Sequence, residues 1–100
     1  MSVRFALEVR LKPGREDDVR AAYGRLRDRL EQGVDGLIVH QLCEASGDEG
    51  RWLITSEWRD ADANRAWESS DEHRALTMPL RDCWQEAKLT HYDVRVEFRT

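Results

Sequence analysis

The 100-residue sequence predicts a single α+β domain, residues 1–100, whose elements follow the order βαββαβ. Apolar and polar residues alternate near both ends, and two short apolar-rich runs lie in the middle, as is typical of four strands. Between them, apolar residues recur every three or four positions, as in amphipathic helices. A chain this short buries one core, so we expect one domain.

The first third of the chain predicts a strand followed by a helix. Apolar residues occupy every second position over 3–11, and the sequence Lys12-Pro13-Gly14 ends this alternation. A helix over 15–32 is predicted next, because its apolar residues share one face. These residues are Val19, Ala22, Tyr23, Leu26 and Leu30.

The middle third predicts a hairpin of two strands, over 37–44 and 51–58, joined by a loop rich in turn-forming residues. The first of these strands is apolar on both faces, so we expect it to be covered on both sides. Strict alternation would direct Gln41 and Cys43 toward the helices, and His40 toward the opposite side.

Residues 60–86 predict two or three short helical pieces. Asp60 or Asp62 can cap the first piece, and Ser69 with Glu72 fits the capping box of a restart. Pro79 is interpreted as a first-turn proline. An apolar stripe that continues to Trp84 places this side chain on the last helical piece, where it closes one end of the core.

A fourth strand is predicted over 91–98, where apolar and polar residues alternate again. Right-handed crossovers then place both helical segments on one face of a four-stranded antiparallel sheet, the ferredoxin-like arrangement. His40 and His91 fall on the opposite face. Its expected apolar residues are Ala6, Ile38, Leu42, Leu53 and Leu89. Because a sheet face this apolar is rarely left exposed to water, we expect a second copy of the chain to cover it, which predicts a homodimer.

Composition narrows the class of partner. Sixteen basic and 20 acidic residues are interspersed along the chain, which argues against nucleic acid. No apolar run approaches the roughly 20 residues of a membrane span, and the N-terminus alternates unlike a signal peptide, so we expect a cytoplasmic protein without a membrane partner. Cys43 and Cys83 match no metal or redox spacing and are predicted to be free thiols.

Three segments together resemble the antibiotic-biosynthesis-monooxygenase-like family: KPGRED at 12–17, the turn Asp35-Gly36-Leu37, and RWLITSEWRDADANRAW at 51–67. The resemblance implies a dimeric α+β barrel with a pocket between the sheet and the helices of each subunit. It also implies one of several activities. These are cofactor-free oxidation of phenolic polycyclic metabolites to quinones, oxidative haem degradation, and non-oxidative polyketide cyclisation.

The resemblance also assigns positions. Trp58 stands at the tryptophan that ends the family's third strand, and Trp67 matches a tryptophan of the haem-degrading group. Ile54 replaces an asparagine of the quinone-forming group, and Leu7 replaces a strand-one asparagine of the haem-degrading group. The iron-binding histidine of that group falls near Leu76 or Thr77 here.

Our first hypothesis is a cofactor-independent monooxygenase that oxidises a polycyclic aromatic or hydroquinone-type metabolite. In this hypothesis His73 removes a phenolic proton and Gln41 orients a substrate oxygen. The predicted substrate-binding residues are Trp58, Trp67, Cys43, Ile54 and Leu7. A haem-binding or haem-degrading enzyme, and a non-oxidative cyclase-like or accessory ligand-binding protein, are the alternatives. Core packing of the tryptophans and a solvated His73 also stay open.

Overall fold

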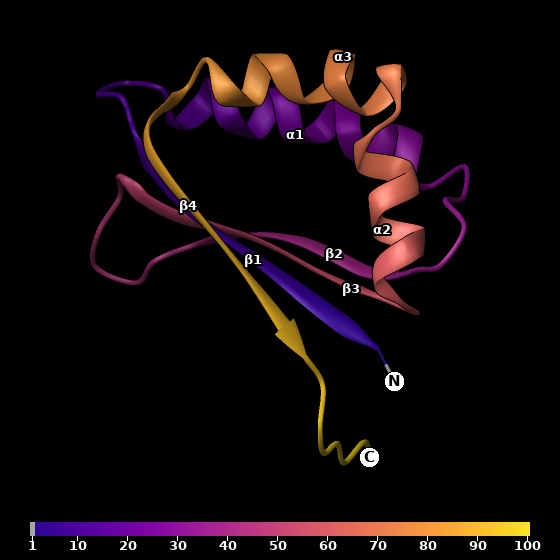
Figure 1. Cartoon of the computed structure of the whole chain (residues 1–100). Coiled ribbons are helices and arrows are strands. Elements are labelled where there is room, and N and C mark those ends of the chain that lie inside the picture. Colours follow the sequence, from indigo (N-terminus) through magenta and orange to yellow (C-terminus); the bar gives the residue numbers. More distant parts are fainter. Residues whose placement is uncertain (1) are drawn as a thin grey trace.

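A computed structural model describes residues 2–100 of the chain. One antiparallel sheet has the strand order β2-β3-β1-β4. Its strands are β1 Val3–Leu11, β2 Leu37–Glu44, β3 Arg51–Trp58 and β4 Trp84–Asp93, and the helices are α1 Glu16–Leu30, α2 Ala61–Glu68 and α3 Asp71–Arg81. Helices α1 and α3 lie side by side over one face of the sheet, and α2 leads from β3 up to α3 (Figure 1). The predicted ferredoxin-like α+β class is confirmed.

The core fills the space between the sheet and the helices. Phe5 pairs with Ser56 and Val9 with Trp52, which sets the face that β1 and β3 present to the helices. Trp58 is 1% exposed and Val19 of α1 is fully buried. A strand with a period of two and a helix with a period of 3.6 therefore bury one apolar face each.

Side-chain caps define where α2 and α3 begin. The Asp60 carboxylate accepts a hydrogen bond from the backbone N–H of Ala63 at 2.8 Å, and the Ser70 hydroxyl accepts one from His73 at 3.1 Å. The predicted restart at Ser69 is therefore one residue too early, because the Ser69 hydroxyl donates to the Arg65 carbonyl at the end of α2.

Pro79 lies inside α3, so its interpretation as a first-turn proline is wrong. A proline at this position has no N–H to donate to the carbonyl of Ala75 one turn earlier. The helix nevertheless continues to Arg81, since Leu80 is only 2% exposed in the core. Burial of the apolar stripe outweighs the lost hydrogen bond.

The fourth strand begins earlier than the predicted 91–98. β4 pairs with β1 from Trp84 to Asp93, and residues 94–100 have no regular secondary structure. Trp84, which was expected on a helix, is the first residue of this strand. The apolar spacing that leads up to it suits a helix as well as a strand, and pairing with β1 decides between them.

A register irregularity in β2 inverts the predicted orientation of its side chains. Leu37 pairs with Trp58, but the next pair joins Val39 to Glu57, so one residue of β2 is extra. From there His40 and Leu42 share the helix-facing side, because they pair with Ser56 and Ile54. A one-residue shift in register sends every later side chain of a strand to the other face.

The predicted apolar composition of the uncovered face is therefore wrong for Leu42 and Leu89. Leu89 and His91 pair with Leu7 and Phe5, so they too lie on the helix side. Leu42 has moved to that side as well. The uncovered face keeps Ala6 and Leu53 and also carries Arg4, Thr55 and Glu57, since these residues share its parity.

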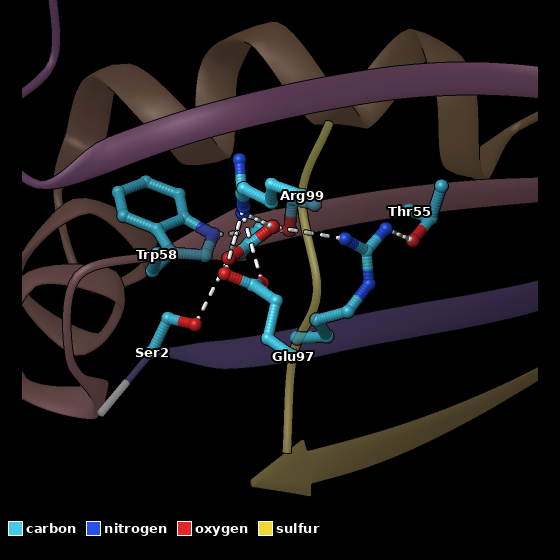
Figure 2. A network of polar contacts seen from close by, with 8 residues as sticks. Ser2, Thr55, Trp58, Glu97 and Arg99 are labelled. Atoms are coloured by element: carbon cyan, nitrogen blue, oxygen red, sulfur yellow. Dashed lines mark hydrogen bonds and ion pairs between the residues drawn. The ribbon is translucent and has the colours of Figure 1, made fainter. Parts of the chain in front are cut away.

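Glu57 is the centre of a polar network on this face (Figure 2). Its side chain is only 5% exposed and pairs with Arg4 at 3.1 Å and with Arg99 at 2.9 Å. The Ser2 hydroxyl donates to it at 2.9 Å. Arg99 also pairs with Glu97 at 2.7 Å. Because Arg99 contacts Glu57 of β3, the residues after β4 return over the sheet. A buried carboxylate is thereby neutralised by two guanidinium groups.

Candidate functional site

A cavity of about 310 Å³ lies between the helix-facing side of the sheet and the helices. Its size is near the lower end of the range of about 300–1,000 Å³ typical of small-molecule sites. The strands contribute Phe5, Leu7, His40, Ile54, Ser56, Trp84 and Leu89, and the helical layer contributes Leu26, Glu68, His73, Thr77, Leu80 and Arg81. Most strand residues of the cavity are apolar, whereas the helical side is largely polar.

The polar side is built mainly by α3. His73, Thr77 and Arg81 are four residues apart, so they follow one face of this helix. The Ser70 cap fixes the first turn and with it the backbone of His73. The Thr77 hydroxyl donates to the His73 carbonyl at 2.9 Å, so this hydroxyl proton is used within the helix.

His40 is held by Tyr23 of α1. The Tyr23 hydroxyl and His40 Nδ1 are 2.8 Å apart, and the two rings lie 5.5 Å from each other. Burial, aided by charge repulsion from His73, lowers the pKa of His40 to about 4. Burial also raises the pKa of Tyr23 to about 12, with a smaller rise from the nearby Cys43 side chain that the positive charge of Arg27 opposes.

Both groups of this pair are therefore uncharged at pH 7. A neutral imidazole donates from one nitrogen and accepts at the other. Because Nδ1 binds Tyr23, Nε2 is the nitrogen of His40 that is left for a ligand, as a donor or an acceptor according to the tautomer.

His73 is the second histidine of the cavity. Burial lowers its pKa, the negative charge of Glu68 opposes this shift, and the positive charge of Arg81 adds to it. The ring packs edge to face on Trp67, with 5.7 Å between the centroids. At pH 7 the cavity thus contains a second neutral imidazole, which is the form that accepts a proton.

Three of the residues predicted for the site lie together. Leu7, Ile54 and His73 all line the cavity, the first two on the sheet and the third on α3. The prediction that Gln41 and Cys43 face the helices is wrong. They pair with Thr55 and Leu53 on the opposite face, because of the irregularity after Leu37.

The two tryptophans proposed as cavity walls lie behind its lining. Trp58 is 1% exposed, and its indole N–H donates to the Ser56 hydroxyl at 3.0 Å. Trp67 is buried between His73 and the guanidinium of Arg29, which lies 5.3 Å from its ring centroid. Both side chains support residues of the cavity and do not line it.

His40 and Trp84 are two of the cavity residues that were not predicted for the site. His40 was assigned to the uncovered face because nothing in the sequence indicates the extra residue in β2. Trp84 was assigned to a helix. The alternation of Ala87, Leu89 and His91, which all face the helices in β4, is the signal that could have placed it on a strand.

No group of three or more histidine, cysteine or acidic side chains within residues 2–100 is arranged to bind a metal ion. None of the helices in this part of the chain is long and apolar enough to cross a membrane. Cys43 and Cys83 are free thiols, as predicted.

Residues 2–77 match the family described as antibiotic biosynthesis monooxygenase. The chain belongs to this family. The segments that resemble it have a clear structural role in this member. Arg59 donates two hydrogen bonds to the Asp35 carboxylate, at 3.1 and 3.3 Å. Gly36 has a φ of 82°, and a Cβ atom there would overlap the side chain of Ala63. These contacts fix the turn before β2 against the start of α2.

Curated relatives of this family member come from Streptomyces. The chain is 36% identical over 92 residues to the "42.8 kDa protein in whiE locus" of Streptomyces coelicolor, covering 92% of this chain and 23% of that protein. It is 40% identical over 78 residues to protein SchA of Streptomyces halstedii, covering 78% and 20%. It is 32% identical to polyketide synthase CurD of Streptomyces cyaneus over 92 residues, covering 92% and 24%. The chain therefore spans a fifth to a quarter of the length of these relatives.

Solved structures share the fold at low sequence identity. SnoaB from Streptomyces nogalater, described as a cofactor-independent oxygenase, superposes with a TM-score of 0.85 at 15% identity, covering 99% of this chain and 98% of SnoaB. A protein from Bordetella bronchiseptica described as an antibiotic biosynthesis monooxygenase has a TM-score of 0.81 at 16% identity, covering 95% and 98%. These likenesses establish the fold.

Proposed function

We propose that this family member is a cofactor-independent monooxygenase that oxidises a polycyclic phenol or hydroquinone-type metabolite. The observation that carries the proposal is a cavity with an apolar sheet side and two neutral histidines, His40 and His73. Phe5, Leu7 and Ile54 offer a flat apolar surface to fused rings. The similarity to a polyketide synthase and to a cofactor-independent oxygenase supports this substrate class.

The reaction requires a substrate that reduces oxygen itself. For an anthrone-type substrate, loss of one proton gives an electron-rich anion that transfers an electron to O₂. The substrate radical and superoxide then combine to a peroxide anion, which takes back the proton and loses water. The CH₂ group becomes a carbonyl, one oxygen atom enters the product, and the other leaves in water. The protein then has to remove the proton, hold the anion and exclude water.

We assign proton removal to His73. Its imidazole is neutral before the reaction, and the adjacent Glu68 carboxylate favours the imidazolium that forms. His40 is the weaker base, with a pKa of about 4, and its link to Tyr23 holds its ring in place. His40 is therefore assigned to orient a substrate oxygen by hydrogen bonding.

The test is oxygen consumption with a panel of anthrones in air, with product formation followed by absorbance. Wild-type protein should consume one O₂ for each quinone formed, and His73→Gln should lower kcat by about 10²-fold or more. Gln41→Ala is the matched control, because this exposed side chain lies on the other face of the sheet and should leave kcat unchanged. No oxygen uptake with any anthrone would contradict the proposal.

A non-oxidative role is the second candidate, as a cyclase-like enzyme or an accessory ligand-binding protein. The neutral His73 can also move a proton during a carbon–carbon bond closure. The relative named polyketide synthase CurD favours this candidate. Ring formation from a linear poly-β-ketone without oxygen uptake would support the cyclase and count against the monooxygenase.

We also propose that the chain forms a homodimer, through residues of which only Leu89 belonged to the predicted interface. Exposed large apolar side chains follow β4 and the segment after it: Leu89 at 49%, Tyr92 at 54%, Val96 at 92% and Phe98 at 87%. β4 is an edge strand, and edges with exposed apolar residues favour pairing with another chain.

Light scattering coupled to size-exclusion chromatography should show a dimer, and Phe98→Ser should shift it toward the monomer. Lys88→Ser serves as a control on the polar side of β4. A wild-type monomer at the highest soluble concentration would contradict this proposal.

A further inference from the structure

Tyr23 and His40 lie at the boundary between the cavity and the outer side of the domain. His40 lines the cavity and also lines two outer grooves between α1 and β2. Tyr23 lines both grooves but is not among the residues that line the cavity. The Tyr23 hydroxyl therefore approaches His40 Nδ1 from the groove side. The two nitrogens of an imidazole ring point away from each other, so Nε2 is directed toward the cavity.

Nε2 of His40 is open to a ligand. Among residues 2–100, the Trp84 indole nitrogen is the one fully buried polar side-chain atom that has no hydrogen-bond partner. Nε2 of His40 also has no partner in this part of the chain, and the residue is only partly buried. Because Nε2 is not a second orphan of this kind, it keeps accessible surface. A ligand in the cavity can therefore reach this nitrogen.

The Tyr23 hydroxyl decides which nitrogen of His40 carries the proton. Within the described residues, Nδ1 is the one hydrogen-bond partner of this hydroxyl. A phenol is a better proton donor than a neutral imidazole, whose bare nitrogen is in turn the better acceptor. Burial raises the pKa of Tyr23 to about 12 and lowers the pKa of His40 to about 4, so the phenol keeps its proton and the ring stays neutral at pH 7. The hydroxyl thus donates to Nδ1, and the imidazole proton is on Nε2.

We propose that Tyr23 is a positioning residue that holds His40 as an N–H donor toward the cavity, so that the site selects fused-ring ligands with a carbonyl or phenolate oxygen beside His40. The inference rests on the proposed function for the aromatic nature of the ligand. It adds the direction of the hydrogen bond and the residue that sets it. In the proposed oxidation, this donor stabilises the negative charge that develops on the substrate oxygen when His73 removes the proton.

The first test reads the tautomer directly. In long-range proton–nitrogen NMR spectra of the ligand-free protein at pH 7, a ring nitrogen that carries a proton differs widely in shift from one that does not. Wild-type protein should show a protonated Nε2 and a bare Nδ1 for His40. Tyr23→Phe should bring the two nitrogen shifts closer together, because two tautomers then exchange. A protonated Nδ1 in wild-type protein, or identical His40 shifts in the variant, would overturn the inference.

The second test uses isothermal titration calorimetry with two soluble probes that differ in their ring oxygens, anthraquinone-2-sulfonate and anthracene-2-sulfonate. His40→Phe should weaken binding of the quinone about 3- to 10-fold, as for loss of one hydrogen bond. Tyr23→Phe should weaken it about 3-fold, because the imidazole is present but its orientation is no longer fixed. The affinity for the anthracene should be nearly unchanged. In the His40→Phe background, Tyr23→Phe should have no further effect on the ratio of the two affinities.

Tyr92→Phe is the matched control, because it removes the hydroxyl of the other tyrosine in the chain. Tyr92 pairs with Arg4 on the uncovered face of the sheet and is 54% exposed, so its hydroxyl lies away from His40. This variant should keep the wild-type tautomer and the wild-type affinity ratio of the two probes. Equal effects of Tyr92→Phe and Tyr23→Phe on this ratio would contradict the inference.

The inference is also overturned if Tyr23→Phe leaves the affinity ratio unchanged, or if wild-type protein binds the quinone no more tightly than the anthracene. These outcomes are separable from the proposed activity. Oxygen uptake with anthrones, without a probe contrast, would refute only the inference on Tyr23. A probe contrast that depends on Tyr23, without oxygen uptake, would refute the monooxygenase and keep the ligand class.

Discussion

Protonation of His40 should destabilise the folded protein in mild acid. Its pKa is about 4 in the folded state, against an ordinary value of 6.5. The unfolded chain therefore binds the proton first as the pH falls. The stability associated with a neutral His40 is fully present above pH 6.5 and is lost as the pH falls from 6.5 toward 4.

The size of the effect follows from the two pKa values. Between pH 7 and pH 5 the expected loss in unfolding free energy is about 2 kcal/mol. This is a large part of the 5–15 kcal/mol that is typical of a domain. Burial also lowers the pKa of His73, which acts in the same direction. The carboxylates of Asp35 and Asp48, each paired with an arginine, have lowered pKa values. Most of their contribution to stability is lost below the pH range of this comparison.

Urea denaturation of wild-type protein and of His40→Gln at pH 7 and pH 5 isolates this contribution, since the variant keeps His73. Wild-type protein should lose about 2 kcal/mol more than the variant over this range. An NMR titration of the imidazole protons should give a direct pKa for His40 well below that of an exposed histidine. Equal pH dependence of the two proteins, or a titration of His40 near 6.5, would refute the reasoning.

Three further predictions concern the turn before β2, the tryptophan behind the cavity, and haem. Gly36→Ala should lower the unfolding free energy by about 2 kcal/mol or more, because the added Cβ overlaps Ala63 and the residue must also keep a positive φ. Gly47→Ala also has a positive φ but meets no neighbouring atom, so it should lower the unfolding free energy by only about 1 kcal/mol. Equal losses in urea denaturation would be inconsistent with this account. Trp67→Ala should lower the unfolding free energy by about 3–5 kcal/mol, as for a core residue. Thermal melting and ligand binding are measured on the same variant. A loss of affinity without a loss of stability would instead favour a role of Trp67 in contacting the ligand. Haemin should give no Soret shift, because Arg81 is the one cation among the described cavity-lining residues available to its two propionates; a clear shift would favour the haem alternative.

The local elements that bury one face were predictable because their signals are contained in neighbouring residues. β2 and β3 have the predicted bounds, and α1 begins and ends within two residues of the prediction. Leu7, Ile54 and His73 were assigned to the pocket by a family resemblance together with alternation and spacing, and all three line it. Each of these inferences needs only the period of one element and the side on which it packs.

The errors in the orientation of β2 and in the start of β4 have one common origin, since each depended on pairing between distant strands. The extra residue of β2 exists only relative to β3, and it exchanged the faces of His40 and Gln41. The start of β4 at Trp84 is set by its pairing with Leu11 of β1. Short-range patterns carry no information on either, because the same apolar spacing suits two registers.

The amino-acid sequence by itself determined the element order, the fold class and the presence of one helix-covered sheet face, because hydrophobic periodicity encodes which face of each element is buried. Only the tertiary structure decided which polar groups meet inside that face. Register brought His40 to Tyr23 and placed Trp84 among the residues that line the cavity. A shift of one residue moves a side chain through the sheet, so the chemistry of the cavity is decided by strand pairing.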